Sequence, residues 1–403
     1  MSDIDKNNIK NIFLIVLDSV RRDVFYSNMQ NMCNEIQNDF VSFSNCNSIY
    51  TNTFNSHYAI FFGDYLFKSK YFDFPYQLQK IGFKIKSFCN SALFTNYPLE
   101  YENIVGQDSV IPFRKQIIDH LGLEPMFVWD KEFLGNNVED YVGSADDEFR
   151  MIPDVWKNYI IENKDNANFV FLHFWKTHHN YGINDFFKDK ITGQNYREIG
   201  KKLINKIKKR EISIKFVKMV YEKRIIEVMN NHILALIKIL KDKDLYHNSL
   251  IIITSDHGEG LGDIGSRLPP KILKIYALFF KIYNRIRRLL KTLPKIKKIP
   301  NRLQFNAFFH NGGYDFQKQV PFLIKFPSCS FGGLKINMDI TLFDIIHTIN
   351  DLIGNQLKIP INGCPLNYLL SEGKFARERY KLNRFIKTQF LNSNFSENAK
   401  KTN

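Results

Sequence analysis

The sequence predicts an α/β protein, a three-layer α/β/α sandwich with a mostly parallel, doubly wound sheet. Apolar runs typical of strands buried on both faces recur at residues 11–17, 168–174 and 250–254. These runs alternate with segments of helical period, among them residues 215–241 and 340–353. Strands that alternate with helices in this way indicate a parallel sheet covered by helices on both faces.

Shorter elements are located by their turn residues and by their apolar period. Residues 56–62 predict a short helix that ends at Gly63, because glycine readily adopts the left-handed conformation that terminates helices. Residues 42–55 are polar and rich in Asn, Ser and Thr, and we predict no regular element there. The other expected elements are a helical turn near residues 30–38, a helix at 72–81, and strands at 83–88 and 320–326.

Length and composition indicate one large domain. The chain has 403 residues, of which 44% are hydrophobic and 15% aromatic, and this is enough to build a sizeable core. We assign residues 8–372 to a single domain, with residues 267–302 as a basic insertion within it. Residues 373–403 are expected to form a polar, partly disordered tail.

Cysteine content and hydropathy favour a reducing, cytoplasmic setting. The five cysteines are odd in number and form no CxxC pair, which argues against a disulfide framework and a structural zinc knuckle. The first ten residues are polar, and no run approaches the roughly 18 to 20 apolar residues that span a bilayer. We therefore expect no signal peptide and no transmembrane helix.

The net charge of +15 is concentrated in one segment. Residues 267–302 contain 12 basic residues and no acidic residue. Within them, residues 271–293 have apolar side chains at alternating steps of three and four, and Pro294 ends the helix that this pattern predicts. Such a helix fits the surface of an anionic membrane, as on the inner membrane face, or packs on the protein core or a dimer partner. No nucleic acid is expected, since no recognised binding module accompanies the basic residues.

Acidic and imidazole side chains follow two of the predicted strands. Asp18 comes directly after residues 11–17, and Asp256 and His257 follow residues 250–254. The carboxyl edge of a parallel sheet is where such folds build their sites, and these side chains are ligands for a divalent cation. An aspartate at the end of a strand also serves as a helix cap or binds its own loop, and this alternative stays open.

Several motifs resemble those of the sulfatase family, within the alkaline phosphatase superfamily. Residues 11–23 look like its opening strand and DSxRxD motif, and residues 254–263 are similar to its second metal motif. Residues 176–181 resemble its THxPY loop, with Asn180 in place of Pro. Residues 310–314 followed by 320–321, the helix at 339–354 and the turn at 362–366 resemble its later motifs, so the likeness runs from about residue 10 to 370.

The resemblance implies that Thr53 is the nucleophile. Residues 53–57 align with the family frame C/S/T-x-P-S-R/H, in which Asn55 here replaces Pro. Thr51 and Ser56 are rival hydroxyls, and Thr53 could instead be only the N-cap of the following helix. Since the signature for formylglycine is not met, the chain resembles the phosphodiesterase, phosphonate hydrolase and phospho-group transferase branches more than the formylglycine sulfatases.

The same resemblance implies the other roles. Asp18, Asp256, His257 and Thr53 would bind one divalent metal ion, with zinc or manganese favoured over calcium or magnesium. His178 and His310 would contact the ester oxygens, and one of them would protonate the leaving group. The expected function is a metal-dependent hydrolase or transferase of a phosphate ester or phosphodiester, on a lipid-linked or glycan substrate. The alternatives are a sulfuric ester hydrolase and an inactive scaffold that binds a membrane or partner, and the oligomeric state is left open.

Overall fold

The structure is a computed structural model. It describes residues 9–65, 73–88, 158–178, 181, 183, 191, 196–209, 211–263, 278, 282–283, 285, 307–309 and 315–372. The account below concerns these residues.

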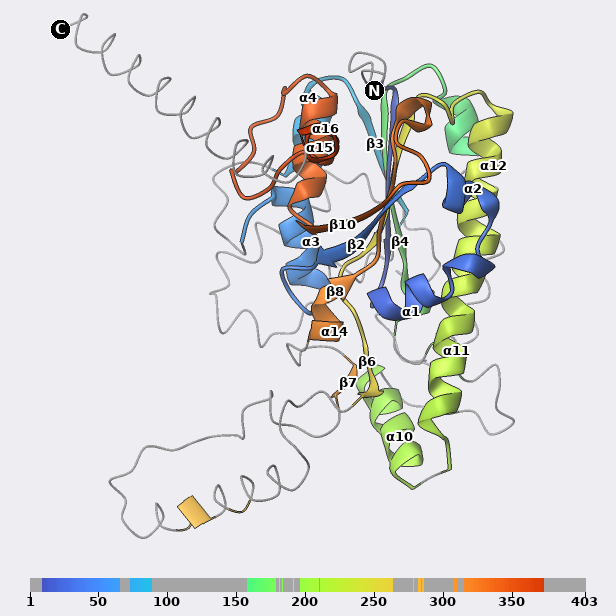
Figure 1. Cartoon of the computed structure of the whole chain (residues 1–403), viewed down its shortest axis with the longest axis vertical. Coiled ribbons are helices and arrows are strands. Elements are labelled where there is room, and N and C mark those ends of the chain that lie inside the picture. The colour runs from blue at the N-terminus through green and yellow to red at the C-terminus, as the bar shows by residue number, and fades with distance from the viewer. Residues whose placement is uncertain are drawn as a thin grey trace, which may run out of the picture.

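A single eight-stranded sheet organises the chain, in the order β10-β2-β9-β5-β1-β4-β3, with β8 paired to β2 (Figure 1). The central strand β1 (Asn11–Leu17) lies parallel between β4 (Asn168–Phe174) and β5 (Ser249–Ser255). β3 (Lys84–Phe88) continues the parallel part beside β4. The three apolar runs are therefore neighbouring central strands, and all of them end at the same edge of the sheet.

The other half of the sheet is mixed. β9 (Phe322–Lys325) runs antiparallel to both β5 and β2 (Val41–Asn47). β10 (Lys335–Thr341) is parallel to β2, and the short β8 (Gln319–Val320) is antiparallel to it. The predicted α/β class with a mostly parallel sheet is confirmed.

The sequence analysis was wrong about β2 and β10. β2 begins at Val41 and covers the first six residues of the polar segment 42–55, where no element was predicted. β10 ends at Thr341 and so includes the first two residues of the helix expected at 340–353, which begins only at Asp344. Both strands carry polar side chains, because β2 is only partly buried and β10 is mostly accessible to solvent. Their pairing partners, rather than their hydrophobicity, specify them as strands.

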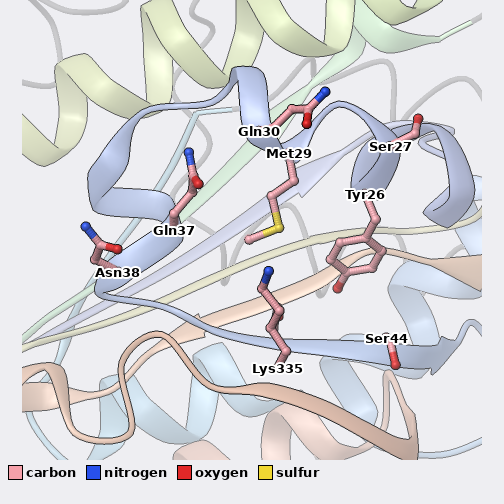
Figure 2. A pocket seen from close by; sticks show the side chains of 9 residues that line it. Tyr26, Ser27, Met29, Gln30, Gln37, Asn38, Ser44 and Lys335 are labelled. Atoms are coloured by element: carbon pink, nitrogen blue, oxygen red, sulfur yellow. The ribbon is translucent and has the colours of Figure 1, made fainter.

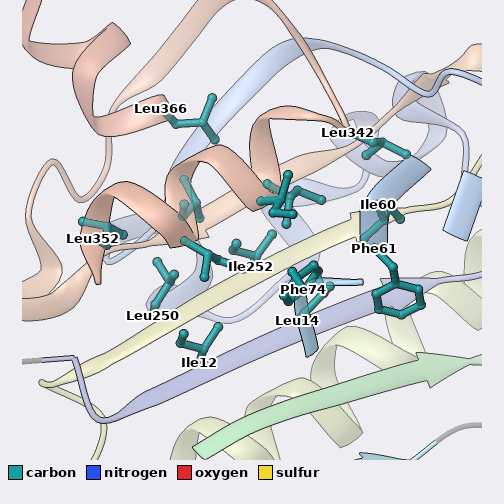
Figure 3. Packing of buried hydrophobic residues seen from close by; sticks show 14 of the residues in the cluster. Ile12, Leu14, Ile60, Phe61, Phe74, Leu250, Ile252, Leu342, Leu352 and Leu366 are labelled. Carbon is teal, nitrogen blue, oxygen red and sulfur yellow. The ribbon is translucent and has the colours of Figure 1, made fainter. Parts of the chain in front are cut away.

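One face of the sheet is covered by α3 (Thr53–Phe62), α4 (Phe74–Lys80), α15 (Asp344–Leu352) and α16 (Leu366–Glu372). Even-numbered residues of β1, Ile12 and Leu14, point into this layer and pack with Phe61 and Leu352 (Figure 3). As predicted, α3 ends at Gly63, whose φ of 63° is left-handed. A Cβ there would meet Ile346 at 2.7 Å, so the site requires glycine for space as well as for conformation.

The opposite face packs odd-numbered residues of β1, Phe13 and Ile15, against a second set of helices. The predicted helix at 215–241 is confirmed but is interrupted by a π turn at Val228–Ile233. The elements on this face are α1 (Arg22–Ser27), α2 (Asn34–Asn38), α10 (Tyr196–Lys208), α11 (Ile214–Glu227) and α12 (Leu234–Asp242), with 3₁₀ turns at Met29–Asn31 and, on other connections, at Trp175–Thr177 and Pro327–Cys329.

A small antiparallel pair extends from the end of β5. β6 (Gly260–Asp263) pairs with β7 (Ala307–Phe309), so that Gly260 lies opposite Phe309 and Asp263 opposite Ala307. The short helix α14 (Asp315–Lys318) then leads back to the sheet. The chain between β6 and β7 contains the predicted basic insertion, most of which lies outside the described residues. Across the part of the chain that the structure describes, no helix combines the length and apolarity needed to cross a membrane.

Candidate active site

The register of β1 and β5 brings the two predicted aspartates together. Leu17 pairs with Ser255, so Asp18 and Asp256 are the next residues at the same edge of the sheet. The backbone N–H of Ser19 donates to Asp256 Oδ1 at 3.0 Å, which ties the exit of β1 to that of β5. Asp18, Asp256 and His257 are fully buried. The structure thus places three of the predicted ligands in one buried cluster.

Ligand atoms of Asp18, Asp256 and His257 all lie within 4.8 Å of one another. His257 Nδ1 is 2.9 Å from the carbonyl oxygen of Gly258. A carbonyl can only accept, so Nδ1 carries the proton and Nε2 presents its lone pair. This Nε2 lies 3.4 Å from Asp256 Oδ2.

The donor set of this cluster fits a divalent cation. Oδ2 of Asp18 and Oδ2 of Asp256 are buried and have no hydrogen-bond partner among the described residues. Burial raises the pKa of both carboxyl groups, and Asp256 raises that of Asp18 further by repulsion. Oδ1 of each carboxylate accepts hydrogen bonds, whereas a buried carboxylate oxygen without a donor is costly unless a cation pairs with it. Two carboxylates and a neutral imidazole suit zinc or manganese.

Thr53 is the first residue of α3 and faces this cluster. Its Oγ1 lies 3.2 Å from His257 Nε2. The N-cap of α3 is Asn52, whose side chain accepts a hydrogen bond from Asn55 N at 3.0 Å. The alternative role of Thr53 as the N-cap is therefore wrong. The rival Ser56 hydroxyl is buried, lies 3.1 Å from the Ser48 hydroxyl and donates to the carbonyl of Tyr50 at 3.3 Å.

Two histidines that were not predicted as site residues join the cluster. His57 on α3 and His173 on β4 are both buried, and their rings lie 5.0 Å apart between centroids. His173 Nε2 is 3.4 Å from Asp18 Oδ2. One ligand atom each from His57, His173 and Asp256 lie within 4.8 Å of one another. The cluster is therefore richer in imidazole than the motifs indicated.

Sequence periodicity carried a signal for both residues. His57 is four residues after Thr53, a spacing that puts both side chains on the same face of a helix. His173 follows Phe169 and Phe171 at steps of two, so it shares their face of β4, and both phenylalanines pack in the α3 layer. What the sequence could not show is that α3 crosses the sheet at β4.

The remaining predicted residues have different outcomes. His178 is buried directly after the 3₁₀ turn Trp175–Thr177, and Thr177 Oγ1 donates to the carbonyl of Asp18 at 2.7 Å. His310 lies outside the described residues, although the preceding Phe309 pairs with Gly260. Arg21, which is the arginine of the DSxRxD motif and was not predicted as a site residue, binds Asp23 through two nitrogens at 2.9 and 2.6 Å and lies over the Phe316 ring. Arg21 thus has structural partners.

A cavity of about 550 Å³ opens elsewhere, between the α1–α2 segment and the strands β2 and β10. Figure 2 shows the amide side chains of Gln30, Gln37 and Asn38 around it, with Lys335 at its base. None of the clustered histidines or aspartates lines this cavity. The candidate site at the carboxyl edge of the sheet is therefore separate from this cavity.

Comparisons with known proteins agree with this fold. The family model described as Sulfatase matches residues 10–355. The chain is similar in structure to the phosphonate monoester hydrolase of Agrobacterium radiobacter, with a TM-score of 0.54 and 14% identity over 91% of this chain and 78% of that one. It is also similar to the phosphonate monoester hydrolase from Silicibacter pomeroyi, with a TM-score of 0.52 and 15% identity over 91% and 77% of the two chains. No curated protein sequence matches this chain.

Proposed function

Because this chain belongs to the sulfatase family, we propose that it is a metal-dependent hydrolase or transferase that acts on a phosphate ester or phosphodiester through Thr53. The observation that carries the proposal is the 3.2 Å separation between Thr53 Oγ1 and His257 Nε2, at the first turn of α3 and beside two buried carboxylates. A cation and the N-terminus of a helix both stabilise the anion of such a hydroxyl.

Asp18, Asp256 and His257 would hold one divalent cation together with Thr53. When bound, this ion would lower the pKa of the hydroxyl and offset charge on the ester oxygens. Thr53 Oγ1 then forms a bond to phosphorus as the bond to the leaving oxygen breaks, and the hydroxyl proton goes to solvent. His178 or His310 donates a proton to the leaving oxygen, and water or an alcohol displaces Thr53.

A phosphorus centre is favoured over sulfur by the residue at the nucleophile position. The frame at residues 53–57 starts with a threonine, whereas formylglycine arises from cysteine or serine. Cys46, the cysteine nearest to this frame in sequence, is buried in β2 within the core layer. A sulfuric ester hydrolase that works without formylglycine is the alternative that direct comparison of substrates would reveal.

We further propose that residues 271–293 bring the enzyme to an anionic membrane surface, where a lipid-linked substrate would be presented. Ile282, one of the apolar positions of the predicted helix, is 46% exposed, which supports an apolar face that the protein core does not cover. Sedimentation with vesicles of phosphatidylserine and phosphatidylcholine tests this at low salt. Pelleting with the mixed vesicles and not with pure phosphatidylcholine is expected, and equal recovery in both supernatants would refute it.

The proposed activity is tested with nitrophenyl esters. Turnover of a phosphodiester, a phosphomonoester, a phosphonate monoester and a sulfate is compared for the metal-loaded wild type and for Thr53→Ala. We expect a phosphorus ester to be the best substrate and Thr53→Ala to lower kcat by about 10⁴- to 10⁶-fold, as removal of a nucleophile does elsewhere. A phosphate adduct on the Thr53 peptide, found by mass spectrometry after acid quench, would identify the attacking oxygen.

Thr51→Ala is the matched control, because Thr51 is a hydroxyl residue two positions before Thr53. It should keep activity within a few-fold of wild type. Loss in Thr51→Ala with retention in Thr53→Ala would transfer the nucleophile role to Thr51. Faster sulfate turnover would favour the sulfatase alternative, and absence of any metal-dependent turnover would favour a scaffold.

A further inference from the structure

We propose that this chain binds a second divalent cation, Zn²⁺, between His57, His173 and Asp256, so that Asp256 bridges two ions. The inference deepens the proposed function, on which it rests only in sharing Asp256 with the first ion. The three residues come from three separate elements, α3, β4 and the exit of β5.

The three side chains already form a compact, buried group. A ligand atom from each lies within 4.8 Å of the other two, and their exposed fractions are 1%, 3% and 0%. Ligands around a tetrahedral zinc ion at about 2.1 Å lie roughly 3.4 Å apart, so the group needs to contract by little more than an ångström. Two imidazoles and a carboxylate are a usual zinc donor set.

The orientation of His57 is that of a metal ligand. Its Nδ1 lies 2.7 Å from the carbonyl oxygen of Thr53 and donates to it, which leaves the lone pair on Nε2. In most histidines that bind metals, one ring nitrogen binds the ion and the other donates its N–H to a carbonyl or carboxylate. This hydrogen bond fixes the tautomer of the ring. His257 has the same arrangement toward Gly258. The bond from His57 also connects this ligand to the backbone of the proposed nucleophile.

The charge of the region favours a second cation. Glu259 is also buried and adds its repulsion to that of Asp18 and Asp256. The ester that the site is proposed to bind is itself an anion, and it would add negative charge beside Asp18 and Asp256. A second ion would offset the charge of the substrate, as paired ions do in other phosphoryl-transfer sites.

The competing explanation is that His57 and His173 are ordinary core residues. His57 also contacts the rings of Phe61 and Phe171, at 5.9 and 5.7 Å between centroids. In that case the two imidazoles would only fill space beneath α3. The two explanations differ in the number of zinc ions that the folded chain retains.

Zinc stoichiometry decides between them. The full chain is stripped with a chelator, titrated calorimetrically with Zn²⁺ alone, desalted and analysed for bound zinc. We expect two ions per chain for wild type and one for His57→Gln and for His173→Gln. His232→Gln is the matched control, because His232 is a buried histidine outside both metal-binding groups, and it should keep two ions. One ion in wild type, or two in His57→Gln, would overturn the proposal.

A spectroscopic measurement keeps the test decisive if a variant fails to fold. Two Mn²⁺ ions that share one carboxylate lie about 3.5–4 Å apart and couple magnetically. The wild-type chain loaded with Mn²⁺ should therefore give a coupled spectrum by electron paramagnetic resonance, and a spectrum of isolated ions would refute the second site. Retained esterase activity with one bound ion that Asp18→Asn removes would contradict this inference while leaving the proposed function intact.

Discussion

Two buried aspartate–histidine pairs in this molecule differ in how their polar atoms are satisfied. On α15, Asp344 accepts hydrogen bonds from Thr341 N and Cys364 N, each at 2.8 Å. His347 Nε2 accepts one from Gly363 N at 3.0 Å. At the carboxyl edge of the sheet, Asp256 Oδ2 has no hydrogen-bond partner among the described residues. All of these side chains are fully buried.

The difference shows that burial and residue type do not separate a structural pair from a functional one. The pair on α15 meets backbone N–H groups, which hold the turn at residues 362–364 against the helix. At the sheet edge, Asp256 Oδ2 is buried without a hydrogen-bond donor among the described residues, and it lies 3.4 Å from His257 Nε2. A buried carboxylate oxygen of this kind is costly, and a bound cation would offset that cost. Each aspartate accepts two backbone N–H hydrogen bonds, but those to Asp344 are divided between its two oxygens. Both of those to Asp256 go to Oδ1, from Ser19 and His257, so Oδ2 receives none.

Asp256→Asn should have the largest effect on function. The variant replaces an oxygen ligand by an amide nitrogen that cannot bind the ion, so kcat/KM should fall by on the order of 10³-fold or more. Chemical denaturation of the metal-free protein should show unchanged or increased stability, because a desolvated charge is removed. A fall in metal-free stability of more than about 2 kcal/mol would mean that Asp256 is structural after all.

Asp344→Asn should lower the stability of the fold and leave the activity unchanged, which is the opposite of the effect expected for Asp256→Asn. The amide NH₂ of the variant would face one of the two backbone N–H groups that now donate to the carboxylate, so that N–H group would lose its acceptor. A buried donor without an acceptor costs about 1–3 kcal/mol, and more where a charge-assisted hydrogen bond is lost. Denaturant titration measures this loss. The specific activity of the folded fraction should equal that of wild type, and a proportionate loss of kcat would remove the distinction between the two pairs.

Removal of the metal by a chelator should also distinguish the two regions, through a smaller change in the free energy of unfolding. Zn²⁺ at about 100 times its dissociation constant raises the free energy of unfolding by about 2.7 kcal/mol when it binds only the folded chain. Thermal unfolding with and without a chelator should show this shift in wild type and in Asp344→Asn. Asp256→Asn should lack it, and a full shift in that variant would place the ion elsewhere.

The smallest effect concerns a third buried charge, Lys325 on β9. Its ammonium donates to the carbonyls of Tyr246, His247 and Ser249, and burial lowers its pKa from its ordinary value of 10.5 to about 8. Between these values the unfolded chain binds more protons, so stability rises with pH. Relative to Lys325→Met, the wild type should gain about 1.5 kcal/mol from pH 8 to 9.5 in denaturant titrations. A flat difference would show that the three carbonyls keep the pKa near its ordinary value.

Sequence reasoning was strongest where hydrophobicity alone specifies structure. β1 and β4 have the bounds that their apolar runs predict, and β5 extends its run by one residue at each end. These strands are buried on both faces, so they leave a continuous apolar signal. β2 and β10 were missed because side chains such as Ser44 and Lys335 face solvent. Such strands form because of the strands they pair with, and the hydrophobic pattern of their own sequence does not identify those partners.

The site divides in a similar way. Asp18, Asp256 and His257 follow directly from the rule that strand ends meet at one edge, and the structure clusters them. His57 and His173 join through the way α3 crosses the sheet, a tertiary arrangement that no local spacing specifies. Their spacing along the helix and the strand indicated which face each side chain occupies. It did not indicate which residues of other elements that face contacts.

The antiparallel stem of β6 and β7 has a consequence for how this protein can change. Asp263 and Ala307 are paired, so the two ends of the segment between them lie next to each other. A longer or different segment between these two ends costs little additional entropy, since the entropic cost of loop closure grows only slowly with loop length. Evolution, or an engineer, can therefore replace the whole of residues 264–306 to suit a new substrate or surface while Asp18, Asp256 and His257 keep their positions.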